Sequence, residues 1–219
     1  TAPTVINDRT MLPIRFIAES FNFSVSWNGD EQAVTITGTK TEEQTPVIQT
    51  EETPEPTGKS LVVYFSATGN TKSLAEKIAE ESGSDIFEIV PEEPYTSADL
   101  NYSNNDCRAN KEHNDETARP AISSKLENTD SYDTIFIGYP IWWGTMPKII
   151  NTFLDTYDLS GKTVMPFCTS GGSGISTSVS DIKSACPGAD VKDGFRGTSA
   201  TNNTQIRQWL DKNTAAEDN

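Results

Sequence analysis

The sequence is poor in the residues that disulfide frameworks and metal sites need. Its 219 residues include three cysteines and one histidine, His113. Three cysteines are too few for a disulfide framework, and their spacing matches no zinc motif. We therefore expect no transition-metal site. Cys168 falls in an apolar run and should be buried, whereas Cys107 and Cys186 could be exposed thiols or a pair.

Basic residues and long apolar runs are also scarce. The chain has 17 Lys and Arg against 32 Asp and Glu, a formal net charge of −15. Because phosphate contacts need basic clusters, nucleic acid is excluded as a partner. No apolar run approaches the roughly 20 residues of a membrane span, so we expect no transmembrane segment in this chain.

The stretch 61–80 organises the rest of the chain. Residues 61–65 form a continuous apolar run, which is typical of a strand buried on both faces. After Thr71 the apolar residues follow helical spacing. Between them, Gly69 permits a tight turn, and hydroxyls lie beside the unpaired N–H groups of the helix start. Such a loop can hold a phosphate without Lys or Arg.

Residues 66–71, Ser-Ala-Thr-Gly-Asn-Thr, resemble the phosphate loop of flavodoxins, whose pattern is (Ser/Thr)-x-Thr-Gly-x-Thr after the first strand. The alternative is an ordinary helix start with polar caps and a glycine turn. The two other common phosphate motifs, Gly-x-x-x-x-Gly-Lys-(Ser/Thr) and a Gly-x-Gly-x-x-Gly between strand and helix, are absent.

Strands and helices alternate from Ser60 onward. This alternation, with apolar strands, predicts an α/β fold with a parallel sheet covered on both faces. Right-handed crossovers then favour a doubly wound five-stranded sheet of order 2-1-3-4-5. The expected strands are 61–66, 86–90, 134–139, 163–168 and 191–195, and the expected helices are 71–83, a short one within 120–126, 147–157, 175–185 and 204–212.

Two further loops follow central strands and should meet the first at the same sheet edge. Residues 138–144 carry adjacent indoles, which suit a flat ring, although Trp142 and Trp143 could be ordinary core residues. Residues 169–174 are rich in glycine and offer unshielded N–H groups, although they could form a simple flexible turn. The order of the three loops along the chain favours one shared site.

Residues 60–213 resemble the flavodoxin-like proteins that carry Gly-Tyr-Pro-Ile-Trp-Trp-Gly and Thr-Ser-Gly-Gly-Ser-Gly loops. The resemblance implies non-covalently bound FMN and electron transfer to a redox partner protein or a small acceptor. It places the cofactor on the three loops, with no catalytic side chain. The residues that it implies are Ser66, Ala67, Thr68, Gly69, Asn70, Thr71, Pro140, Ile141, Trp142, Trp143, Gly144, Thr169, Ser170, Gly171, Gly172, Ser173 and Gly174.

A polar insertion at 91–119 departs from minimal flavodoxins. It could cover the ring or form a substrate pocket, and Tyr102, Arg108 and Glu112 are candidate lining residues. Arg108 and Glu112 could instead simply pair, since they lie four residues apart. The insertion keeps open an alternative function, an FMN-dependent NAD(P)H oxidoreductase of quinones or other small acceptors.

The first 40 residues differ from the rest and predict a small α+β appendage, with a helix from Pro13 to about Phe21 and then a hairpin that turns at Asn28-Gly29-Asp30. Residues 7–19 and 25–36 resemble the N-terminal domain of copper amine oxidases, a module common on exported proteins of Gram-positive bacteria. Without His or Cys in this segment, we expect no copper site. Residues 41–59 are acidic and proline-rich, typical of a linker, so the flavodoxin-like domain should span 60–219. The resemblance favours an extracellular or cell-surface location, whereas the flavodoxin part alone favours the cytoplasm.

Overall fold

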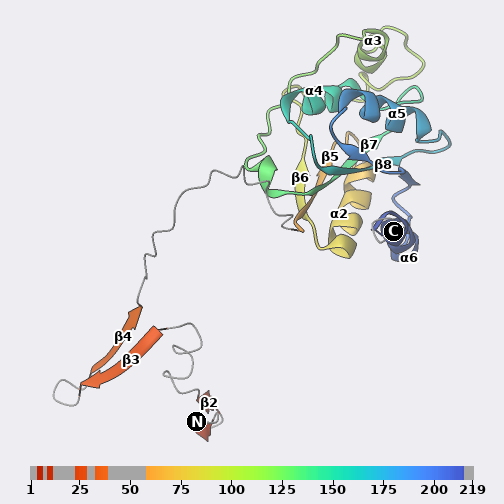
Figure 1. The fold of residues 1–219 in the computed structure, drawn as a ribbon. Coiled ribbons are helices and arrows are strands. Elements are labelled where there is room, and N and C mark those ends of the chain that lie inside the picture. Colours follow the sequence, from red (N-terminus) through yellow and green to blue (C-terminus); the bar gives the residue numbers. More distant parts are fainter. Residues whose placement is uncertain (1–3, 7–8, 12–22, 29–32, 39–57, 215–219) are drawn as a thin grey trace. The chain divides into compact units, whose positions relative to one another are not determined.

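The computed structural model describes residues 4–6, 9–11, 23–28, 33–38 and 58–214, with side chains described for residues 58–213. The chain divides into two compact units, Thr1–Glu51 and Glu52–Asn219, which are described separately (Figure 1).

The first unit contains two antiparallel strand pairs. Strand β1 (Thr4–Ile6) pairs with β2 (Arg9–Met11), and β3 (Phe23–Asn28) pairs with β4 (Ala33–Gly38). The second pair joins the two strands of the expected hairpin, with Asn28 opposite Ala33, and residues 29–32, where the turn was expected, lie outside the described residues. The helix expected near residues 13–21 lies outside the described residues.

The second unit is built on one parallel sheet. Its strands are β5 (Ser60–Tyr64), β6 (Asp85–Glu88), β7 (Thr134–Pro140), β8 (Thr163–Thr169), β9 (Asp190–Val191) and β10 (Phe195–Gly197). They lie in the order β6-β5-β7-β8-β10, with β9 beside the start of β8. This confirms the predicted order 2-1-3-4-5 and the doubly wound fold.

Helices cover both faces of this sheet (Figure 1). Helices α2 (Asn70–Ser82) and α6 (Asn203–Thr214) pack on one face, and α4 (Lys148–Thr156) and α5 (Ser176–Ala185) pack on the other. Alternate strand residues serve the two layers: Val63 and Ile137 face α4, whereas Val62 and Phe136 face α2 and α6. No helix in the described ranges is long and apolar enough to cross a membrane.

Three segments differ from expectation. Residues 120–126 form no helix, because they pair with the chain beyond β6: Ser123 N–H donates to the Val90 carbonyl and Pro91 forms a bridge with Ile122. The expected last strand is split into β9 and β10 around Gly194, where an added Cβ would lie 2.7 Å from Val179. The insertion contains a short helix, α3 (Arg108–Asn114), and a 3₁₀ turn, η1 (Thr129–Ser131), follows it.

Candidate functional site

The loop between β5 and α2 leaves the helix start open. Gly69 adopts a left-handed conformation with φ of 86°, and its N–H donates to Ser66 Oγ at 3.1 Å. No side chain caps α2, and its first turn carries no acidic residue. The first backbone N–H groups of the helix therefore remain available, at the positive end of its dipole.

The Thr71 hydroxyl joins this loop to the loop after β8. Thr71 is 1% exposed and its Oγ1 lies 2.8 Å from Oγ1 of Thr169, which is 7% exposed. Since no other side-chain hydrogen bond reaches either hydroxyl among the described residues, this contact holds the two loops together directly. The sequence places these threonines 98 residues apart.

The loop after β7 is a tight turn from Trp142 to Thr145. Trp142 N–H donates to the Thr145 carbonyl at 2.9 Å, and the reverse bond measures 3.1 Å. Trp143 and Gly144 between them have φ of 45° and 87°. Two consecutive positive φ angles are the mark of a type I′ turn, which glycine adopts readily and tryptophan rarely does. The turn therefore holds the Trp143 backbone in a strained conformation.

The two tryptophans of this turn face different surroundings. Trp142 is 7% exposed and meets Phe65 and Tyr95 edge-on, with ring centroids 5.6 and 5.1 Å apart. Trp143 is half-buried, with Tyr102 at 4.4 Å and His113 at 5.8 Å from its ring centroid. Only Trp142 belongs to the aromatic core under the sheet edge.

The loop after β8 presents small residues beside the first two loops. Thr169 accepts a hydrogen bond from Ile141 N–H at 3.0 Å, and Ser170 N–H donates to the Gly197 carbonyl at 3.3 Å. An added Cβ at Gly171 or Gly172 would meet nothing within 4 Å. Hydrogen bonds therefore fix the start of the loop at Thr169 and Ser170, and Gly171 and Gly172 have free space at their Cβ positions.

The three loops surround a cavity of about 500 Å³ at the carboxyl ends of the strands. None of the described residues that line it is charged. Eight of the predicted residues line its wall: Thr68, Asn70, Pro140, Ile141, Trp142, Thr169, Ser170 and Gly171. The other predicted residues lie in the same loops outside this wall: Ser66, Ala67, Gly69, Thr71, Trp143, Gly144, Gly172, Ser173 and Gly174.

The rest of the wall comes from segments that the sequence left unassigned or only suggested. Leu100 and Tyr102 of the insertion and Thr198 and Ser199 after β10 line it too. Lys77 of α2 holds the second segment, because its Nζ donates to the Ser199 and Thr201 carbonyls at 2.8 and 2.9 Å. The sequence feature that could have indicated Thr198 and Ser199 as lining residues is the run of small residues Gly197-Thr-Ser-Ala-Thr201, at the end of the last strand of the sheet.

Tyr95 anchors the insertion to the cavity wall. Its ring lies 5.5 Å from Phe65 as well as against Trp142, and the Arg108 guanidinium lies 4.1 Å above it. Its hydroxyl donates to Glu112 at 2.6 Å, and Arg108 pairs with Glu112 at 2.7 Å. Arg108 and Glu112 therefore form the ion pair that was the alternative to a lining role. Burial, and then Glu112, raises the pKa of Tyr95, which keeps the hydroxyl a donor.

The cysteines are free and buried. Burial raises the pKa of the Cys168 thiol to about 12. Cys107 and Cys186 are 4% and 8% exposed, so the expectation of exposed or paired thiols was wrong. Within the described ranges no group of three His, Cys, Asp or Glu side chains is placed to hold a metal ion.

A family model described as flavodoxin matches residues 59–213, and one described as copper amine oxidase N-terminal domain matches residues 1–53. A structure from Bacteroides eggerthii, of a protein assigned as a flavoprotein, is 49% identical with a TM-score of 0.69; the match covers 71% of this chain and 98% of that one. A flavoprotein from Lactobacillus acidophilus, solved in complex with FMN, is 29% identical with a TM-score of 0.57 over 69% of this chain and 98% of its own.

A curated relative is also similar over part of the chain. An NAD(P)H dehydrogenase (quinone) from Acidovorax ebreus is 31% identical over 105 residues. The match covers 44% of this chain and 45% of that protein, so it spans less than half of the relative's length.

Proposed function

Because the chain belongs to the flavodoxin family, we propose that it binds FMN at the carboxyl ends of β5, β7 and β8 and acts as an electron carrier. The observation that carries the proposal is the convergence of the three predicted loops on one uncharged cavity beside the open start of α2.

The phosphate would lie against residues 66–71. The uncapped N–H groups of α2 and the Thr68 hydroxyl suit an anion without a nearby cation. The Thr71 hydroxyl would not contact the phosphate directly, because it is hydrogen-bonded to Thr169. It would instead hold the phosphate loop in its conformation.

The flavin ring would lie between the loops after β7 and β8. Trp142, Ile141 and Pro140 supply an apolar side, and the backbone of residues 169–171 supplies polar groups for the ring edge. When bound, FMN supplies the one- or two-electron chemistry, and the chain binds it, orients it and sets its surroundings.

Binding of FMN and riboflavin to the purified chain tests this proposal by calorimetry. We expect FMN to bind much more tightly than riboflavin, because the loop serves only the phosphate. Gly69→Val should weaken FMN much more than riboflavin, because a β-branched residue resists φ of 86° and would distort the loop.

Gly161→Val is the matched control. Gly161 also has positive φ, 75°, and open space at its Cβ position, but it lies before β8 at the other end of the sheet. It should cost similar stability and leave FMN affinity unchanged. Equal affinity of the chain for FMN and riboflavin would contradict the assignment.

A second candidate function is an FMN-dependent NAD(P)H oxidoreductase of quinones or other small acceptors. Two observations favour it: the insertion contributes Leu100 and Tyr102 to the cavity wall, and the partial relative is named a quinone dehydrogenase. A carrier needs no substrate pocket. Anaerobic stopped-flow mixing of the FMN-loaded chain with NADH or NADPH separates the two, since fast bleaching of the flavin supports the enzyme and its absence supports the carrier.

We also propose that the chain works outside the cytoplasm, at the surface of a Gram-positive bacterium. The support is the match of residues 1–53 to the copper amine oxidase N-terminal domain and the acidic segment that follows. Fractionation of the source organism tests it: recovery from the cell wall or medium supports the proposal, and recovery only from cytosol contradicts it.

A further inference from the structure

The turn at residues 142–145 forms part of the wall of the proposed FMN site, yet its backbone is strained. Trp143 and Gly144 have φ of 45° and 87°, and a bulky residue such as tryptophan rarely adopts a positive angle. The backbone hydrogen bonds between Trp142 and Thr145 close the turn but do not join it to another element. Because strained backbone persists only where its surroundings hold it, contacts from other elements are needed to keep this conformation.

Asp181 of α5 supplies a polar contact of this kind. Its carboxylate accepts a hydrogen bond from the hydroxyl of Thr145, the last residue of the turn. Within the part of the chain that the structure describes, no other side-chain hydrogen bond reaches residues 142–145. Both side chains are half-buried, so water competes less for the bond than it would at the open surface.

Helix α5 is itself fixed to β7, the strand that leads into the turn. Ser178 lies one helical turn before Asp181 and accepts a hydrogen bond from the Tyr139 hydroxyl at 3.0 Å. Tyr139, Ser178 and Ile182 are all 0% exposed. The bond from Thr145 to Asp181 therefore connects the turn to a helix that the core holds in place.

We propose that Asp181 is a positioning residue for the cofactor: through Thr145 it holds the turn in the conformation that places Trp142 along the flavin ring. The inference rests on the proposed FMN site. Neither Asp181 nor Thr145 lines the first cavity, the one that the three loops surround, so their effect on FMN would pass through the turn. A hydrogen bond to a carboxylate suits this role, because it is stronger than a bond between neutral groups.

Calorimetry of FMN binding to variants of the full chain tests the proposal. Thr145→Val removes the donor with little change in volume, and Asp181→Ala removes the acceptor. Each should weaken FMN by about tenfold, as expected for the loss of one hydrogen bond to a charged group. The double variant should lose no more than either single variant, because both remove the same bond. Thr145→Ser keeps the hydroxyl and should retain most of the affinity.

NMR of the flavin-free chain gives a readout that does not depend on FMN. The Trp143 ring is stacked on His113, with centroids 5.8 Å apart, and burial lowers the His113 pKa. If the turn relaxes, the indole should move away, the Gly144 amide should shift and the His113 pKa should rise. Loss of the Asp181 charge by itself would lower the His113 pKa, so a rise in Asp181→Ala reports movement of the turn.

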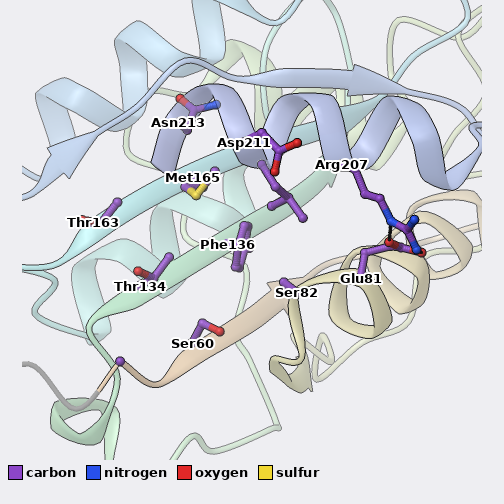
Figure 2. A pocket seen from close by; sticks show the side chains of 12 residues that line it. Ser60, Glu81, Ser82, Thr134, Phe136, Thr163, Met165, Arg207, Asp211 and Asn213 are labelled. Atoms are coloured by element: carbon purple, nitrogen blue, oxygen red, sulfur yellow. Dashed lines mark hydrogen bonds and ion pairs between the residues drawn. The ribbon is translucent and has the colours of Figure 1, made fainter. Parts of the chain in front are cut away.

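Two control variants remove similar groups away from the turn. Thr152→Val removes a hydroxyl of α4 that donates to the Pro120 carbonyl at 2.9 Å. Glu81→Ala removes a carboxylate that pairs with Arg207 beside a second cavity, at the amino ends of the strands and thus at the opposite end of the sheet (Figure 2). Both should leave the FMN affinity and the Gly144 amide unchanged.

The two readouts separate this inference from the proposed function. If the unaltered chain does not bind FMN, the proposed function fails, and NMR still decides whether Asp181 holds the turn. An unchanged Gly144 amide and His113 pKa in both single variants would overturn the proposal. So would unchanged FMN affinity in a chain whose turn has moved, additive losses in the double variant, or an equal loss in Thr145→Ser and Thr145→Val.

Discussion

Neighbouring residues of the same type can have different roles, as Trp142 and Trp143 show. The sequence predicted aromatic surfaces at both positions, but only the turn geometry decides that Trp142 is buried in the core whereas the half-buried Trp143 contacts Tyr102 and His113. That geometry depends on positive φ at Trp143, a conformation that the sequence does not suggest for a bulky residue. The sequence therefore located the loop correctly and left the orientation of its side chains undecided.

His113 should titrate below its ordinary range. Partial burial, and then the positive charge of Lys148, lowers its pKa. Because the folded chain holds this proton less tightly than the unfolded chain, the contribution of His113 to stability is present above about pH 6.5 and is lost as the pH falls below it. Since the sequence has one histidine, a single NMR titration of the imidazole measures the effect.

Two variants identify the causes of this shift. Trp143→Ala removes the ring stacked on the imidazole, and Lys148→Gln removes the nearby charge, so each should raise the His113 pKa towards its ordinary value. A midpoint at or above about 6.5 in the unaltered chain would contradict the assignment.

At the scale of elements, local signals succeeded where tertiary contacts agreed with them. The apolar runs at 61–65 and 134–139 became β5 and β7, and the spacing of Leu74 and Ile78 became the buried face of α2. The helix prediction for residues 120–126 was wrong because their backbone pairs with residues 90–92, about 30 positions earlier in the chain. The cavity residues Leu100, Thr198 and Ser199 were missed for the same reason, since only the fold brings them to the loops.

Close packing of β7 against β8 makes Gly138 sensitive to a single methyl group. A Cβ at Gly138 would lie 2.1 Å from the Phe167 ring, which is fully buried. Gly138→Ala should lower the free energy of unfolding by about 1–3 kcal/mol, measured by urea denaturation. Gly171→Ala, with nothing within 4 Å of its Cβ position, should change it by far less. Similar losses in both variants would show that the ring moves aside.

The insertion should depend on Tyr95 for its attachment. Tyr95→Ala removes ring contacts with Phe65 and Trp142, so amide exchange in α3 should become faster in hydrogen–deuterium exchange. Tyr95→Phe removes only the bond to Glu112 and should have a smaller effect. Helix α6 serves as the internal reference in the same experiment. Unchanged exchange of α3 in Tyr95→Ala would assign the attachment to Arg108 and its partners.

The acidic balance of the whole molecule bears on the proposed electron transfer. Residues 60–219 carry 23 acidic and 13 basic side chains, and 13 − 23 gives a net charge of −10. The described residues that line the first cavity include no cation to offset this charge. Electrons added to a bound flavin would increase its negative charge. The negative charge of the surrounding protein disfavours this reduced state, and a nearby positive charge would be needed to offset it.

The midpoint potential of the bound flavin should therefore lie below that of free FMN, and it should rise with ionic strength. Added salt screens the surface carboxylates, with a Debye length that shortens from roughly 10 Å at 0.1 M to about 3 Å at 1 M. Redox titration of the FMN-loaded chain against reference dyes at low and high salt measures both effects, with free FMN as the control. A potential above that of free FMN, or one that falls as salt is added, would show that contacts inside the cavity outweigh the charge of the whole molecule.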